Sequence, residues 1–237
     1  MDMSNIPNHI AIIPDGNRRW ARLHGVPTIE GHREGVNRAI EILETLYEHG
    51  IPFFTFWGSS LSNLTTRTKE EIFALEQLYA LQFKKLVENR QIHKKRVKIR
   101  VLGPWESVLG KKAVSSIRKA EKKTEHYGDF SLTFLIAYDG IEEMIRAMEQ
   151  IASEARESRD LVINSELLKK HLYTRELPPV DLVIRTGGEP HLSAGFMMWD
   201  IAESQLEFSE KLWPDYTKDD FAAAISKFQK RERRFGT

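Results

Sequence analysis

Short apolar runs of strand type alternate with long helical patterns along almost the whole chain of 237 residues. The runs lie at 9–13, 53–57, 97–102, 132–137 and 181–184, with weaker candidates at 196–199 and 206–208. They are apolar on both sides of the pleat, which is typical of strands in a sheet covered on both faces. This alternation is the strongest constraint on the fold, and it predicts an α/β architecture.

The intervals between these runs have helical spacing, at 30–49, 68–89, 104–127, 140–158 and 217–234. Gly50 follows the first of them, where a C-terminal cap belongs, and Thr68 with Glu71 forms a possible capping box. Strands joined by helices imply crossover connections, so we predict a mostly parallel central sheet flanked by helices. Because no repeat and no linker rich in Gly, Pro or Ser divides the chain, we expect a single domain over 1–237.

The helix at 68–89 is apolar over more than one stripe. Its apolar residues are Ile72, Phe73, Leu75, Leu78, Tyr79, Leu81, Phe83 and Leu86. Such a helix is either buried on two sides or has one stripe that lines a cavity for an apolar ligand. Periodicity alone leaves both interpretations open.

Composition excludes several classes of protein and of site. Lys plus Arg is 35 and Asp plus Glu is 34, so the net charge is +1, which argues against a dedicated nucleic-acid binder. The basic residues at 93–98 and 111–112 are interpreted as solvated surface. There is no Cys, which excludes disulfides, thiolate metal sites and a cysteine nucleophile. No apolar run approaches the roughly 18 residues of a transmembrane helix, and we expect no signal peptide.

The first predicted strand is followed by a sequence suited to binding phosphate, Asp15-Gly16-Asn17-Arg18-Arg19-Trp20. Gly16 allows a tight turn, after which backbone amides at the start of a helix can face an anion. Arg18 and Arg19 add guanidinium groups that match phosphate geometry. The Asp15 carboxylate would repel a diphosphate unless Mg²⁺ lies between them. An ordinary Asp-Gly turn with surface arginines is the alternative.

Two further strand ends carry polar residues of the same kind. The run that starts at Asp181 leads into Arg185, a Gly-Gly pair, His191 and Ser193. The segment 59–67, after the second strand, is polar and of loop type, with Asn63 and Arg67 as groups able to bind anions or protons. Since the carboxyl ends of parallel strands face the ligand crevice, we expect these groups to converge there.

Together, the stretches 9–20, 31–35, 181–189 and 231–236 resemble the cis-prenyltransferases, the family of undecaprenyl diphosphate synthase. The resemblance covers nearly the whole chain in the same order. It implies a parallel sheet with a hydrophobic tunnel, and an enzyme that condenses isopentenyl diphosphate with an allylic diphosphate such as farnesyl diphosphate. The product would be a cis-polyprenyl diphosphate. The resemblance also implies a Mg²⁺-dependent homodimer, and we expect it in the cytoplasm; a peripheral contact with the membrane for product release is left open.

The resemblance assigns roles to individual residues. Asp15 matches the aspartate that holds Mg²⁺ and helps the diphosphate leave, and Asn63 matches the asparagine assigned to proton removal from isopentenyl diphosphate. The positions that match substrate-binding residues are Gly16, Asn17, Arg18, Arg19, Trp20, His32, Ser60, Arg67, Arg185, His191, Ser193, Arg234 and Gly236. The last two belong to an Arg-x-Gly tail that reaches across the dimer in the family.

This chain departs from the family pattern at several of these positions. Gln205 stands where the family has its second metal carboxylate, so it is a candidate metal ligand of altered strength. His191 replaces an Arg, Thr28 replaces an Arg, Ser62 replaces a Glu and Leu64 replaces a Trp. These departures suggest altered substrate use, altered metal binding or reduced activity.

Three functions therefore remain open at this point. The first is an active cis-prenyltransferase that makes a polyprenyl diphosphate. The second is a prenyltransferase of the same fold whose product is short or irregular. The third is a weakly active or non-catalytic partner subunit, against which the intact Asp15 and Asn63 argue. Product length is not fixed by sequence, although Gly58 and Phe134 could either face the tunnel or fill the sheet core.

Overall fold

The computed structural model describes residues 5–158 and 160–231. Its sheet has six strands in this part of the chain, in the order β3-β4-β2-β1-β5-β6, and each neighbouring pair is parallel. The strands are β1 (His9–Ile13), β2 (Phe53–Trp57), β3 (Val97–Leu102), β4 (Phe130–Leu135), β5 (Leu182–Arg185) and β6 (Gln205–Phe208). The predicted α/β fold with a parallel sheet is confirmed.

Helices connect the strands and flank the sheet. They are α1 (Asn17–Leu23), α2 (Thr28–His49), α3 (Leu61–Thr66), α4 (Lys69–Glu88), α5 (Arg90–Lys94), α6 (Trp105–Val108), α7 (Lys111–Thr124), α8 (Gly140–Glu157), α9 (Ser165–His171) and α10 (Lys218–Lys230), with a 3-10 turn η1 (Trp213–Asp215). No helix within 5–158 and 160–231 has the length and the apolar character needed to cross a bilayer.

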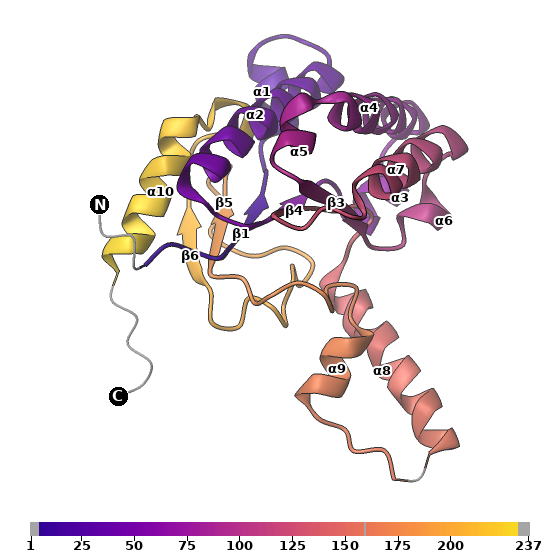
Figure 1. Ribbon diagram of the computed structural model, residues 1–237. Helices are drawn as coiled ribbons and strands as arrows, with labels where there is room; N and C mark the ends of the chain where they lie inside the picture. Colours follow the sequence, from indigo (N-terminus) through magenta and orange to yellow (C-terminus); the bar gives the residue numbers. More distant parts are fainter. Residues whose placement is uncertain (1–4, 159, 232–237) are drawn as a thin grey trace.

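The two faces of the sheet are covered differently. Alternate strand residues such as Ile10, Ile12 and Phe54 point into a large core under α2, α4, α7 and α10. The residues between them, such as Ala11 and Ile13, point into a smaller core covered by the segment that follows α9. Figure 1 shows α2, α4 and α7 on one side, with α8 and α9 extending away on the other. Both faces are therefore buried, as the apolar strands predict.

The strand order fixes where a ligand crevice lies. From β1 the chain moves to β2 on one side, whereas β5 and β6 lie on the other side of β1. The loops that follow β1 and β5 therefore leave neighbouring strand ends in opposite directions. In parallel α/β sheets such a switch point opens a crevice at the carboxyl ends of the strands.

Two sequence predictions near the sheet are wrong. The weak strand candidate at 196–199 is a series of turns, because Ala194, Gly195 and Met197 adopt positive φ angles of 48°, 57° and 42°. Phe196 and Met197 are fully buried against the second face of the sheet. They are apolar because they cover this face, not because they belong to a strand. The segment 61–66, expected to be a loop, is the short helix α3.

The remaining differences lie at element boundaries and in short helices: the strand predicted at 132–137 is β4 at 130–135, and α5 and α9 were not predicted. The predicted helix 104–127 is divided into α6 and α7, because the chain is extended at Leu109 and Gly110. Thr68 does cap α4, where its hydroxyl accepts the Glu71 amide, and Gly50 ends α2 at φ 67°. The last helix ends at Lys230; the rest of the predicted stretch beyond Arg231 lies outside the described residues.

Candidate active site

An ion pair joins the loops that follow β1 and β5. Arg185, at the end of β5, is only 5% exposed, and its Nη2 donates to Asp15 Oδ2 at 3.0 Å. The Thr186 hydroxyl donates to the Asp15 carbonyl at 2.8 Å. On the other side of the carboxylate, Arg19 Nη2 lies 3.4 Å from Asp15 Oδ1. Asp15 is thus held between two arginines at the predicted crevice.

The same arginine organises the loop that carries His191 and Ser193. Arg185 Nη1 donates to the His191 carbonyl at 2.6 Å and to Ser193 Oγ at 2.8 Å. The Ser193 hydroxyl lies 3.4 Å from His191 Nε2. These residues, predicted from sequence to serve one substrate, are therefore brought together beside Asp15, with their side chains partly open to solvent.

Glycines allow the loops to approach one another closely. Gly16 has φ 115°, and a Cβ there would lie 2.9 Å from Leu212. Gly187 has φ 92°, and a Cβ there would lie 2.5 Å from Arg19 Nη2. Residues with a Cβ rarely adopt such backbone angles, so both turns depend on glycine. Gly16 precedes α1 with no side-chain hydrogen bond to its first amides.

The rest of α1 is fixed by contacts with the C-terminal part of the chain. Trp20 Nε1 donates to Asp215 Oδ1 at 2.8 Å, and its ring stacks on His24. The Asn17 carboxamide oxygen is buried and has no hydrogen-bond partner among the described residues. An unpartnered buried acceptor of this kind marks a place where a bound group or water is expected.

A second cluster of cationic and polar side chains lies at the start of α4. Arg67 Nη1 is 3.5 Å from His32 Nε2. Burial, together with the nearby charges of Arg67 and Arg18, lowers the pKa of His32 from 6.5 to about 4, so this histidine is neutral. Burial also lowers the pKa of Arg67. An anion bound here would relieve the repulsion within the cluster.

The segment 59–67 holds Asn63 near this cluster. Ser60 caps α3 by accepting the Asn63 backbone amide at 3.1 Å, and its hydroxyl lies 2.9 Å from that of Ser62. Ser60 is thereby a capping residue that sets the position of Asn63. Within the described residues, Asn63 is half-buried at the carboxyl end of β2.

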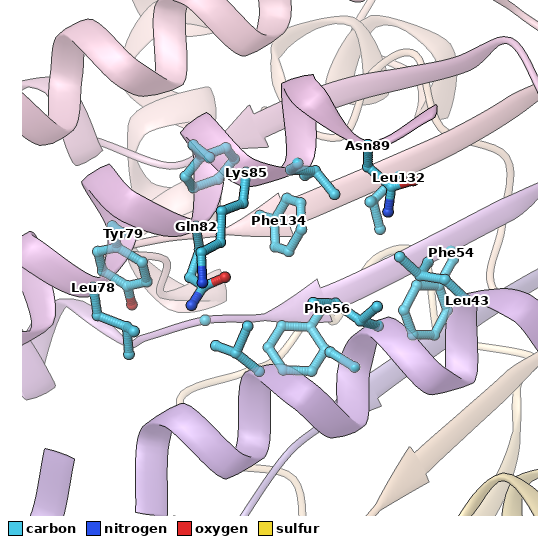
Figure 2. A pocket seen from close by; sticks show the side chains of 16 residues that line it. Leu43, Phe54, Phe56, Leu78, Tyr79, Gln82, Lys85, Asn89, Leu132 and Phe134 are labelled. Atoms are coloured by element: carbon cyan, nitrogen blue, oxygen red, sulfur yellow. The ribbon is translucent and has the colours of Figure 1, made fainter. Parts of the chain in front are cut away.

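An apolar cavity of about 140 Å³ opens between α2, α4 and strands β2 and β4. Figure 2 shows its walls, which include Phe56 from β2 and Phe134 from β4. Gly58 and Phe134, left undecided between tunnel and core, both line it. One stripe of α4 therefore lines a cavity, while the helix also packs against α7; that the cavity takes an apolar ligand stays a prediction.

Tyr79 lies where the cavity meets the cationic cluster. Its hydroxyl sits over Gly58, it is buried, and it makes no hydrogen bond of normal geometry with a described residue. Burial raises its pKa, while Ser59 and Arg67 lie close enough to oppose that rise. The apolar cavity and the cationic cluster are thus neighbouring parts of one site.

The Asp15 carboxylate is an oxygen donor of the kind that Mg²⁺ prefers in proteins. No group of three or more acidic or histidine side chains in 5–158 and 160–231 could hold a metal ion. Mg²⁺ is often bound by one or two carboxylates together with substrate phosphates and water. Asp15 would therefore hold Mg²⁺ only together with a bound diphosphate, and the ion would there neutralise negative charge.

Within one chain, Gln205 does not approach this carboxylate. It is paired with Leu182 at the start of β5 and is level with Ile10, about 10 Å along the sheet from Ile13. Its Oε1 accepts from Arg231 Nη1 at 3.4 Å. The neighbouring Glu207 is ion-paired with Lys227 and Arg231. A metal role for Gln205 would therefore have to be exercised in another copy of the chain.

Some residues of the site were not predicted, and some predicted residues cannot be placed. Arg234 and Gly236 lie outside the described residues. Thr186 and Asp215 were missed, and Tyr79 was predicted only as one of the apolar residues of the helix 68–89, without a role for its hydroxyl. The Thr next to Arg185 was the available signal for the first; Asp215 lies 195 residues from Trp20, so no local pattern could reveal it.

Comparisons with known proteins agree on one family. A family model described as putative undecaprenyl diphosphate synthase matches residues 13–236. The chain is 40% identical to the tritrans,polycis-undecaprenyl-diphosphate synthase (geranylgeranyl-diphosphate specific) of Pyrococcus horikoshii, over 98% of this chain and 87% of that protein. It is 37% identical to the isoprenyl transferase of Thermotoga maritima, over 98% of this chain and 97% of that protein.

A solved structure has the same fold over the full length. It is the crystal structure of lavandulyl diphosphate synthase from Lavandula x intermedia in complex with dimethylallyl diphosphate. The TM-score is 0.89 at 31% identity, and the match covers 98% of this chain and 99% of that one.

Proposed function

Because the chain belongs to the cis-prenyltransferase family and is an enzyme of that family, we propose that it condenses isopentenyl diphosphate with an allylic diphosphate to give a cis-polyprenyl diphosphate. The observation that carries this proposal is the junction at Tyr79 between a cationic cluster and an apolar cavity. An allylic diphosphate has the same two parts, a charged head and a hydrocarbon tail. Each part would meet a matching environment.

The allylic head is proposed to bind around Arg18, Arg19, His32 and Arg67. Guanidinium groups form charge-assisted hydrogen bonds with diphosphate oxygens and stabilise the charge that develops on the leaving group. Mg²⁺ held by Asp15 and the diphosphate would supply further stabilisation of that charge. The neutral His32 can accept from Arg67 and thereby orient it.

Isopentenyl diphosphate is proposed to bind at the loop organised by Arg185. There His191 and Ser193 present polar side chains beside Asp15. Holding both substrates with reacting carbons in contact is mainly a positioning effect. Asn63 Oδ1 is assigned to accept the proton that leaves the isopentenyl unit.

A homodimer completes the proposal. The α8 face exposes Ile141, Ile145 and Met148, and the edge strand β6 exposes Leu206 and Phe208. Unpaired edge strands and apolar helix faces are commonly covered by a partner. A second copy would cover them, and a contribution of Gln205 to a metal site would have to be made there.

A second candidate, a short or irregular product, is favoured by one observation. The lavandulyl diphosphate synthase structure, bound to the short dimethylallyl diphosphate, shares the fold over 99% of its length. The experiment therefore offers dimethylallyl, farnesyl and geranylgeranyl diphosphates separately, each with labelled isopentenyl diphosphate and Mg²⁺. Product chromatography should show diphosphates longer than the primer by whole isoprene units. The absence of any product longer than the primer, labelled or unlabelled, with every primer would overturn both candidates.

A further inference from the structure

Besides the Tyr79 hydroxyl, three polar side chains line the otherwise apolar cavity, those of Gln82, Lys85 and Asn89, and Gln82 is the first of them past Tyr79 along the chain. Gln82 belongs to α4, and Figure 2 shows its amide pointing away from the helix into the space beside Tyr79 and Phe56. The neighbouring wall residues Phe83 and Phe134 are apolar. No hydrogen bond joins the Gln82 side chain to another residue in the part of the chain that the structure describes.

An amide in such a place interacts with water when the cavity is empty of hydrocarbon. A prenyl tail that extends past it must displace that water and offers no hydrogen bond in return. The amide is then left without a hydrogen-bond partner. The free energy that this costs opposes the favourable free energy of burying more of the tail. The barrier comes from the polarity of the side chain and is separate from the barrier that its volume presents.

The position of Gln82 along α4 determines how far into the cavity this barrier lies. Gln82 lies three residues, about 4.5 Å along the helix axis, beyond Tyr79, which marks the end near the diphosphate site. The cavity wall formed by α4 and its C-terminal cap runs from Leu78 to Asn89, roughly 16 Å. Beyond the amide, apolar side chains of the other walls continue alongside the polar Lys85 and Asn89, so the tail meets Gln82 before the cavity ends; these apolar residues are Leu43, Phe54 and Leu132.

We propose that Gln82 is a specificity-determining residue that limits, by its polarity, the length of prenyl tail that the cavity accepts. This inference rests on the proposed prenyl transfer. It assigns to Gln82 the depth at which further elongation becomes unfavourable, and it predicts that an apolar side chain of similar size allows longer products.

The test compares Gln82→Met, which keeps the volume and removes the amide, with Gln82→Ala, which also enlarges the cavity. Gln77→Leu is the matched control, because Gln77 lies on the same helix but hydrogen-bonds with Lys112 at 2.9 Å outside the cavity. Product chromatography should show longer products for both Gln82 variants and unchanged products for the control. A change in Gln82→Ala alone would mean that volume, not polarity, sets the limit, and would overturn the proposal.

A binding measurement separates this inference from the proposed function. Unreactive thio-diphosphate analogues with dimethylallyl, farnesyl and geranylgeranyl tails are titrated into each protein. In the parent, affinity should stop rising once the tail passes Gln82, whereas Gln82→Met should bind the longest analogue roughly tenfold more tightly. Equal tail-length profiles in parent and variant would overturn the inference even if the parent is active. A parent that binds the analogues but makes no product would instead contradict the proposed function.

Discussion

Asp15 is the residue on which the proposed chemistry depends most. Its carboxylate is the acidic group at the junction of the β1 and β5 loops, held by Arg185 and Arg19. Sequence reasoning identified Asp15 and Arg185 from their places at strand ends, and His191 and Ser193 through the family resemblance. It could not show that the Arg185 guanidinium already forms hydrogen bonds with other residues of the protein, since those bonds depend on how the two loops fold together.

Asp15→Asn should lose several orders of magnitude in turnover. The amide oxygen can still accept from Arg185, so the fold should persist, but the charge that binds Mg²⁺ is lost. Isothermal titration of Mg²⁺ into protein loaded with a thio-diphosphate should show tight binding in the parent and weak binding in the variant. Near-normal turnover in Asp15→Asn would contradict the assigned role.

Two histidines make stability depend on pH. Burial lowers the pKa of His9 and, aided by Arg67 and Arg18, that of His32, each from 6.5 to about 4. Below pH 6.5 the two histidines bind protons in the unfolded chain but remain neutral in the folded chain. The free energy of unfolding therefore falls as the pH drops. Between pH 6.5 and 5 the loss should be on the order of 2 kcal/mol per histidine.

Urea unfolding at pH 7, 6 and 5 measures this slope. His32→Gln should show about half the loss of the parent, because His9 remains. A parent whose stability is flat over this range would show that the two histidines are not held neutral.

At the scale of elements, the strands were predicted from the sequence more accurately than the segments that cover the sheet. Strand runs at 9–13, 53–57 and 97–102 are found as predicted, because fully buried parallel strands need continuous apolar residues. The run at 196–199 misled, since residues that cover a sheet face are as apolar as those within it. The helix α3 was missed because six residues are too few to show a period.

The turn after β5 offers a test of how closely two loops must approach. Gly187→Ala would strain a residue at φ 92° and press on Arg19, so turnover should fall by about tenfold or more. Gly50→Ala is the control, because Gly50 has φ 67° and nothing within 4 Å of its Cβ position. It should lose about 1 kcal/mol of stability with normal kinetics. Equal kinetic losses in both would show that strain alone matters.

At the scale of the whole molecule, the exposed apolar faces of α8 and β6 predict a homodimer. Light scattering should give twice the chain mass of 27.5 kDa. Ile145→Asp, placed on the exposed stripe of α8, should shift the mass towards the monomer. Phe73→Asp, an equally drastic change on exposed α4, should leave the dimer intact. A parent that runs as a monomer would contradict the proposed assembly.

The parallel sheet with a cavity under α2 and α4 was predicted in outline, through the resemblance and through the helix at 68–89. The polar groups in the wall of that cavity were not predicted. The amide of Gln82 and the hydroxyl of Tyr79 can be recognised as unusual only once the apolar residues around them are known. Long-range packing also places Gln205 away from Asp15 within the chain.

The most direct test of the central claim is the geometry of the bond that the enzyme makes. Carbon-13-labelled isopentenyl diphosphate is incubated with the preferred allylic primer, Mg²⁺ and either the parent enzyme or Asp15→Asn, and the product is examined by NMR. The proposed function predicts a labelled unit joined to the primer through a new cis double bond, formed by the parent and not by the variant. A new trans double bond, or incorporation no greater than in Asp15→Asn, would contradict it.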